Sequence, residues 1–296
     1  MLTSVKVLLT SIIDYAGLFP PAKLGIQAAM VNYANYQRTP YRWMLNHFVL
    51  PVSRLEEFAN FVPTLDLKQW SLSLIISEHW ESEIEVVRSS QRSLQLLHSK
   101  NQIAVTSLEF PVLSPIEIEK VIPYLPDQVE AFFEIPLNVD LQPYLAVLKH
   151  TKAAAKIRTG GITLEAFPSI TQLSLHILAF AEAQVSFKAT AGLHHPLLGN
   201  YYVTYEPDSP STLMHGFLNV AVMAALVYWQ KVTAQEALEV LQSASNIFHF
   251  TDDAITWRDY HLNIAEIEQA RQQFFRSFGS CSFQEPVDNL QELKLL

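Results

Sequence analysis

The sequence contains a single cysteine and only eight glycines among its 296 residues. The lone thiol of Cys281 cannot form an intrachain disulfide or a cysteine-based zinc site, so we expect a reducing, cytoplasmic environment. Only 17% of the residues are charged, and the formal net charge is −9 with no dense basic run. Nucleic acid is therefore not an expected partner, because binding to a polyanion depends on clustered lysine and arginine.

The sequence also has few long apolar runs. The most apolar stretch, residues 213–229, contains His215 and Asn219 and is shorter than the roughly 20 apolar residues that a membrane span needs. We interpret it as a buried helix with a core histidine and expect no membrane partner. Near the amino end, Asp14 closes a short apolar run that no cleavage signature follows, which argues against a signal peptide.

What the sequence does have is hydrophobic residues (49%) in short β-branched runs that alternate with amphipathic stretches. This rhythm predicts βα units and a parallel sheet. We predict one α/β domain over residues 1–296, a (β/α)8 TIM-type barrel with an irregular tail over 279–296; an open doubly wound sheet is the alternative. The predicted strands are 5–13, 45–51, 72–77, 103–110, 129–135, 153–158, 185–190 and 246–250, and the last predicted helix covers 264–278. Helix-starting capping boxes are predicted at Ser53/Glu56, Ser114/Glu117 and Thr233/Glu236.

Two of the predicted strands carry lysines where parallel strands should be apolar. The sixth strand places Lys156 and Arg158 on one face, and the seventh places Lys188 and Thr190 on one face, since side chains alternate along a strand. The bulky apolar residues of these strands should meet the helices. The lysines are therefore expected to point into the barrel.

Neighbouring strands add carboxylates. Glu109 and Glu134 lie near the carboxyl ends of the fourth and fifth strands, and Asp14 ends the first. Barrel active sites form at that end, so we expect these groups to meet Lys156 and Lys188 there. The alternative is that Lys156–Glu134 and Lys188–Glu109 are structural ion pairs across the barrel interior.

This combination suits covalent chemistry on carbonyl compounds. A neutral lysine can form a Schiff base, and a second cation nearby favours the neutral form. In this hypothesis Lys156 is the nucleophile, Lys188 tunes it, a glutamate moves protons and Arg158 binds an anionic group.

The turns after the lysine strands contain Thr159, Gly160, Gly161 and Gly192, followed by His194 and His195. Glycine permits close backbone approach to a ligand such as a phosphate, although these glycines could equally serve to turn the chain. One of two adjacent histidines is expected to reach the site as an acid, base or metal ligand. Cys281 has no evident base beside it, which favours a structural role.

Five segments resemble the signature segments of a bacterial protein family without an established activity. They are Asp14-Tyr-Ala-Gly-Leu-Phe-Pro-Pro21, Lys156-Ile-Arg-Thr-Gly-Gly161, Phe187-Lys-Ala-Thr-Ala-Gly-Leu-His-His-Pro196, His215-Gly-Phe-Leu-Asn219 and Phe278-Gly-Ser-Cys-Ser-Phe283. The resemblance covers essentially the whole chain and implies no function.

Residues 153–192 resemble the later strands of class I aldolases of the deoxyribose-phosphate aldolase type. The resemblance implies that Lys156 forms the Schiff base and that Lys188 is the second lysine on the next strand. It covers about a fifth of the chain, and it departs from the pattern at Arg158 and at the two histidines after Gly192. Similarity of position does not establish function.

The leading hypothesis is a lyase that acts on a small anionic carbonyl compound and needs no cofactor. One alternative is a metal-assisted isomerase or hydrolase that uses His194 or His195 with Asp14, the glutamates and a divalent metal. Another is a non-catalytic, anion-binding or sensory barrel. The sequence leaves the substrate open, and a homo-oligomer is possible.

Overall fold

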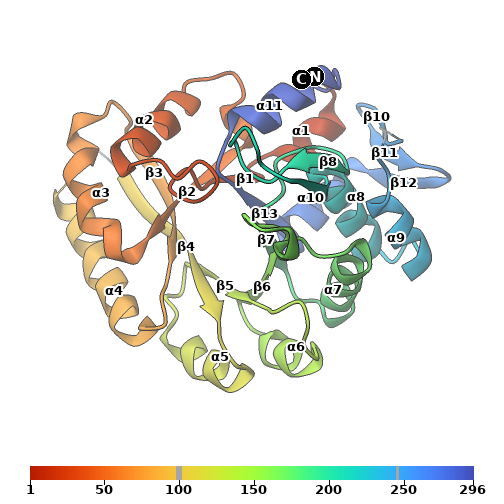
Figure 1. The fold of residues 1–296 in the computed structure, drawn as a ribbon. Helices are drawn as coiled ribbons and strands as arrows, with labels where there is room; N and C mark the ends of the chain where they lie inside the picture. The colour runs from red at the N-terminus through yellow and green to blue at the C-terminus, as the bar shows by residue number, and fades with distance from the viewer. Residues whose placement is uncertain (98–101, 245–246) are drawn as a thin grey trace.

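In the computed structural model, which describes residues 1–97, 102–244 and 247–296, eight parallel strands close into a barrel. Around the barrel they follow the order β1 (Ile13–Tyr15), β13 (Phe275–Ser280), β7 (Phe187–Thr190), β6 (Ala153–Arg158), β5 (Glu130–Glu134), β4 (Gln102–Val112), β3 (Gln69–Ile75) and β2 (Leu45–Pro51). Helices surround the strands (Figure 1). The predicted barrel is thus confirmed, and the open sheet is excluded.

The helices are α1 (Thr3–Leu9), α2 (Ile26–Tyr36), α3 (Leu55–Phe61), α4 (Trp80–Leu97), α5 (Pro115–Val121), α6 (Gln142–Leu148), α7 (Ile170–Ala183), α8 (Phe217–Tyr228), α9 (Ala234–Leu241), α10 (Ile264–Gln273) and α11 (Gln284–Glu292). A hairpin, β8 (Gly199–Tyr202) and β9 (Ser211–Met214), follows β7. A small antiparallel sheet, β10 (His249–Phe250), β11 (Ala254–Trp257) and β12 (Tyr260–Asn263), precedes α10.

The middle of the chain follows the sequence pattern closely. The strands predicted at 45–51 and 153–158 have those bounds, and the predicted capping boxes that begin at Ser114 and Thr233 are present. The capping box predicted at Ser53 is wrong, because Ser53 lies in a short 3-10 turn and α3 begins two residues later without a side-chain cap.

The predictions at the two ends of the chain need correction. Residues 3–9 form α1, and the first strand is only Ile13–Tyr15. A short apolar run does not by itself distinguish a buried helix from a strand.

The eighth barrel strand is β13, and the helix predicted over 264–278 ends at Gln273. The spacing of Ala270, Phe274 and Phe278 fits a helix, but Phe275 packs its ring against Phe187 of β7, 5.0 Å between centroids. Consequently the region after residue 279 is not an irregular tail, because it completes β13 and then forms α11. The strand predicted at 246–250 begins outside the described residues, and its end forms β10 of the small sheet.

The apolar stretch around residue 220 is a buried helix, as predicted. Every residue of α8 from Phe217 to Val227 is buried. The helix begins later than the apolar run because residues 211–214 form β9. His215 is buried, and its Nε2 lies 2.8 Å from the carbonyl oxygen of Pro168. Within the described ranges, no helix is long and apolar enough to cross a membrane.

Candidate active site

Lys156 and Lys188 are paired in register on the neighbouring strands β6 and β7. Both point into the barrel, where Lys156 is 4% exposed and Lys188 is 1% exposed. The outward face of these strands carries apolar residues such as Phe187, which packs against Phe180 of α7. The alternation of polar and apolar residues thus positions both lysines in the barrel interior.

Lys188 is held as an ammonium ion by two carboxylates. Its Nζ donates hydrogen bonds of 2.6 Å to Oδ2 of Asp14 and 2.6 Å to Oε1 of Glu109, and it lies 5.3 Å from the ring centroid of Phe132. Burial favours the neutral amine, but the charges of Asp14 and then Glu109 outweigh it and raise the pKa of Lys188. Lys188 therefore does not supply a neutral amine for nucleophilic attack.

Asp14 is fully buried inside the barrel, which corrects its expected place at the catalytic face. Its Oδ1 accepts a hydrogen bond from Asn46 at 2.8 Å and lies 2.8 Å from Nδ1 of His47, while Oδ2 accepts from Ser277 at 2.5 Å. Burial favours the neutral acid, but Lys188 and then His47 lower the pKa of Asp14. This carboxylate is a fully bonded anion that holds Lys188.

Lys156 has a looser environment than Lys188. Its Nζ lies 3.2 Å from Oε2 of Glu134 and 3.7 Å from Oε2 of Glu109. Ser73 donates a 2.8 Å hydrogen bond to the other oxygen of Glu109, which also binds Lys188. Burial opposes ionisation of Glu109, but Lys188 and then Lys156 lower its pKa. Both predicted ion pairs, Lys156–Glu134 and Lys188–Glu109, are present.

Arg158 lies at the carboxyl end of β6 and reaches solvent, with 48% of its side chain exposed. Its Nε donates a 3.0 Å hydrogen bond to Oε1 of Glu134. Despite burial, Lys156 and then Arg158 lower the pKa of Glu134. The cluster thus runs from the dry centre of the barrel, at Asp14, to its solvent-facing end, at Arg158.

A pocket of about 460 Å³ opens at this end of the barrel. Lys156, Glu109, Glu134 and Arg158 line its polar side, and Lys188 is not among its lining residues. The rest of the lining is largely apolar and comes from the loops after β1, β6, β7 and β13 and from the carboxyl-terminal parts of β2, β3, β4, β7 and β13. A pocket of this size suits a small molecule.

The glycine-containing turns mainly pack against each other. Gly192 has φ +77, and a side chain there would lie 2.5 Å from the carbonyl oxygen of Thr159 and 2.8 Å from Cα of Gly160. Thr159 is fully buried, and its hydroxyl donates to the carbonyl of Ala191. Of the turn residues Thr159, Gly160, Gly161 and Gly192, only Gly161 lines the pocket, and Thr190 and Ala191 line it beside Gly161.

His194 lines the pocket and His195 does not, as expected for neighbours that point in different directions. Nδ1 of His194 lies 3.1 Å from the hydroxyl of Ser280, whereas Nδ1 of His195 lies 2.8 Å from Oδ1 of Asn289. Burial, followed by His195, lowers the pKa of His194 to about 4, so this imidazole is neutral at pH 7. Burial raises the pKa of the Cys281 thiol, which also lines the pocket.

The metal-ligand set considered for the alternative hypothesis does not come together. Asp14 contacts His47 and Lys188 in the barrel interior, while His194 and His195 face Ser280 and Asn289. Within the described part of the chain, no group of three or more His, Cys, Asp or Glu residues has an arrangement that could hold a metal ion.

Sequence reasoning missed the residues that hold the two buried carboxylates. Asn46, His47 and Ser277 bind Asp14, and Ser73 binds Glu109. The signal was available, because each is a polar residue in a buried parallel strand. The rule that identified the lysines also applies to Asn46 and His47 in β2 and to Ser73 in β3. It does not apply to Ser277, because the sequence predicts a helix there.

No protein-family model, curated protein or solved structure matches this chain. The function therefore has to be inferred from the geometry of the pocket and of the charges beneath it.

Proposed function

We propose that this protein is an enzyme that acts on a small anionic carbonyl compound through a Schiff base on Lys156, with lyase chemistry of the class I aldolase kind. The observation that carries the proposal is the difference between the two lysines. Lys156 lines the pocket with a carboxylate 3.2 Å away, whereas Lys188 is fixed below it by two short hydrogen bonds.

Arg158 is the group suited to bind the anionic part of the substrate. Its guanidinium is half exposed at the pocket and already binds one carboxylate, that of Glu134. A substrate carboxylate or phosphate would compete for this guanidinium. Withdrawing Arg158 removes one of the causes that lower the pKa of Glu134, which makes Glu134 a better base when substrate is present.

Glu134 then has two proton transfers to perform. It takes a proton from the ammonium of Lys156, and the freed amine attacks the carbonyl carbon to give a carbinolamine. Protonated Glu134 returns its proton to the carbinolamine hydroxyl, which leaves as water and yields the iminium ion. In the cleavage that follows, a hydroxyl on the departing fragment loses its proton and becomes a carbonyl, the carbon–carbon bond breaks, and its electron pair forms an enamine. A proton then adds to the enamine carbon to give the product iminium ion, and water hydrolyses this ion to release the product and regenerate Lys156.

Borohydride trapping tests the proposal. The full-length protein is incubated with glyoxylate, pyruvate or dihydroxyacetone phosphate, reduced, digested and mapped by mass spectrometry. We expect an adduct on Lys156 and none on Lys188, and no adduct in Lys156→Arg, which keeps the positive charge but cannot form the imine. A broad panel of anionic aldehydes and ketones that leaves Lys156 unmodified would refute the covalent mechanism. A ligand that stabilises the fold and is recovered unchanged would favour the anion-binding barrel.

A further inference from the structure

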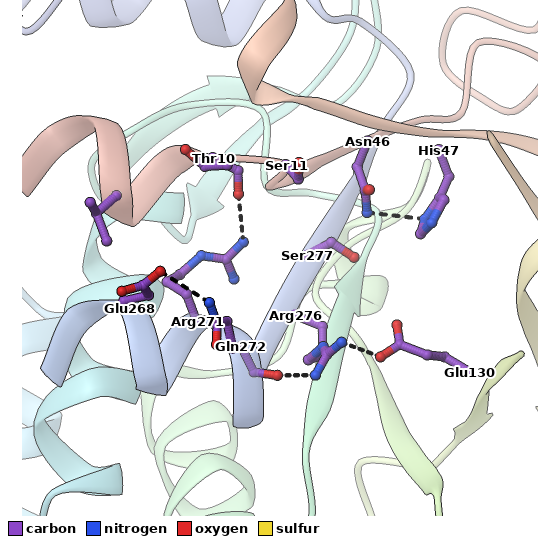
Figure 2. Close-up of a pocket in the computed structure, with 11 residues that line it drawn as sticks. Thr10, Ser11, Asn46, His47, Glu130, Glu268, Arg271, Gln272, Arg276 and Ser277 are labelled. Atoms are coloured by element: carbon purple, nitrogen blue, oxygen red, sulfur yellow. Dashed lines mark hydrogen bonds and ion pairs between the residues drawn. The ribbon is translucent and has the colours of Figure 1, made fainter. Parts of the chain in front are cut away.

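A second pocket, of about 330 Å³, lies at the opposite end of the barrel, where the strands begin (Figure 2). Its lining residues come from the starts of β2, β5 and β13, from α1 and the turn after it, and from α10. The polar groups that matter most are Asn46, His47, Glu130, Arg271, Arg276 and Ser277. As far as the structure describes the chain, this pocket and the Lys156 pocket share no lining residue.

Among the described residues, Arg271 is a buried cation in this pocket that has no carboxylate to pair with. It is 9% exposed, and its guanidinium donates to three main-chain carbonyls: Leu8 at 2.8 Å, Thr10 at 3.3 Å and Phe275. Within the described ranges no acidic side chain forms an ion pair with it. The guanidinium also lies over the ring of Phe275, with its Cζ 5.5 Å from the ring centroid. Buried charges are ordinarily paired, so a guanidinium held by neutral groups indicates a site for a negative charge.

The hydrogen bonds of Arg271 do not involve all the N–H groups of its guanidinium. A guanidinium has five N–H groups, and the three carbonyls occupy three of them, one on each nitrogen. The two others, one on each terminal nitrogen, have no partner in the described part of the chain. A pair of terminal N–H groups matches the two oxygens of a carboxylate or phosphate.

The other charged side chains of this pocket either bind other partners or are exposed to solvent. Arg276 pairs with Glu130 and donates to the carbonyl of Gln272. Glu268 lies exposed on α10 and accepts a 3.2 Å hydrogen bond from Gln272, so solvent screens its charge. Burial, followed by the nearby charge of Arg276, lowers the pKa of Arg271 to about 9, with Asp14 acting in the opposite direction. The net charge at Arg271 is therefore positive, and its guanidinium is poorly hydrated.

We infer that this pocket is a second ligand site, and that it binds a small oxyanion, a carboxylate or a phosphate, on the free N–H groups of Arg271. The volume lies at the lower end of the range for small-molecule pockets, so we expect a small ligand. The site is distinct from the one proposed to carry the reaction, so the inference does not depend on that reaction.

Replacing Arg271 itself could unfold the protein, because its guanidinium joins α1 to β13 through their carbonyls. Ser11 offers a cleaner test. It is exposed, lines the pocket and has φ 49, a conformation that Asp and Asn both adopt readily. Ser11→Asp places a carboxylate in the lining of the pocket that contains Arg271, and Ser11→Asn is the matched neutral control.

The experiment measures binding of inorganic phosphate and of succinate to the full-length protein by titration calorimetry, at constant ionic strength. We expect the unmodified protein and Ser11→Asn to bind at least one of the two probes with the same affinity, and Ser11→Asp to bind it at least about tenfold more weakly. Arg158→Gln removes the guanidinium proposed to bind anions in the other pocket. In that background a binding site should remain that Ser11→Asp weakens and Ser11→Asn does not. Preference for one probe distinguishes a phosphate site from a carboxylate site.

Three outcomes would overturn the inference. In the first, neither probe binds at about 10 mM, a concentration that corresponds to a binding free energy of about −3 kcal/mol. In the second, Ser11→Asp and Ser11→Asn bind the probe with equal affinity. In the third, Arg158→Gln loses binding and Ser11→Asp has no effect. The last result would place the anion in the Lys156 pocket instead.

Discussion

Lys156 and Lys188 occupy paired positions on adjacent strands, and only Lys156 reaches the pocket. They contact opposite oxygens of one carboxylate, Glu109, at 3.7 Å and 2.6 Å respectively. The closer contact commits Glu109 to Lys188. Lys156 is left with Glu134 as its nearest carboxylate, at the edge of the pocket where a substrate would arrive.

The pair formed by Asp14 and Lys188 should be strongly coupled. Lys188→Met leaves Asp14 and Glu109 as buried anions without their main cation, so we expect a loss of about 3–5 kcal/mol in the free energy of unfolding. Asp14→Asn combined with Lys188→Met should cost less than the sum of the single changes. Urea denaturation of the four proteins gives the coupling energy.

The exposed ion pair of Arg38 and Asp66 is the control for the double-mutant cycle of Asp14 and Lys188. Its side chains are 54% and 92% exposed, so removing either should change the free energy of unfolding by no more than about 1 kcal/mol. Additive effects of the Asp14 and Lys188 changes would contradict a direct buried pair.

Glu134→Gln should slow imine formation on Lys156 without preventing substrate binding. The amide cannot take the proton from Lys156 or return it to the carbinolamine, and loss of such a proton-transfer group typically costs about 100- to 10,000-fold in rate. Single-turnover trapping at saturating carbonyl compound measures this rate. Glu119→Gln, at an exposed position on α5, is the matched control. An unchanged rate in Glu134→Gln would assign the proton transfer to another group.

Arg158→Gln should weaken the binding of anionic carbonyl compounds selectively. A hydrogen bond to a charged group contributes about 1.5–3 kcal/mol, so the concentration that half-saturates trapping should rise by about one to two orders of magnitude. A neutral aldehyde such as propanal provides the comparison, because its half-saturation should not rise. Equal effects on pyruvate and propanal would show that Arg158 shapes the pocket and does not bind the anion.

Acid should destabilise the protein through the buried carboxylates. The pKa values of Asp14, Glu109 and Glu134 are lowered in the folded state, so they contribute stability above the ordinary carboxyl pKa of about 4 and lose it as the pH falls further. Below that value the unfolded chain binds more protons, so stability rises with pH. Urea denaturation, measured at intervals of about one pH unit between about pH 3 and pH 7, gives the slope of the free energy of unfolding against pH.

Glu134→Gln should reduce that acid slope by up to about 1.4 kcal/mol per pH unit, the effect of one proton. The variant and the unmodified protein should therefore differ most near neutral pH and converge in acid. Parallel curves would mean that Glu134 is not ion-paired in solution.

The barrel and most of its charged cluster could be predicted from the sequence because both follow from one rule. Buried parallel strands are apolar on both faces, so a lysine or glutamate in such a strand marks the barrel interior. Strands 45–51 and 153–158 were bounded by clear changes in pattern, and Lys156 was placed correctly through period-two alternation.

The remaining features could not be predicted because they depend on pairing between distant segments. Phe275–Ser280 is a strand since it lies between β1 and β7, and its own apolar spacing fits a helix equally well. The place of Asp14 was mistaken for the same reason, because its depth in the barrel is set by its neighbours on β13 and β2. Local patterns do not contain this information.

The bond between Asp14 and Lys188 also constrains how the protein can be made. The two residues are separated by 174 positions, and Ser277, which binds the same carboxylate oxygen, follows much later. During synthesis Asp14 emerges from the ribosome long before either partner exists. Its carboxylate must stay in water until then, because a dry environment without a counter-charge is costly. The early strands therefore cannot seal a dry interior by themselves, and the last βα units complete the fold in both connectivity and charge.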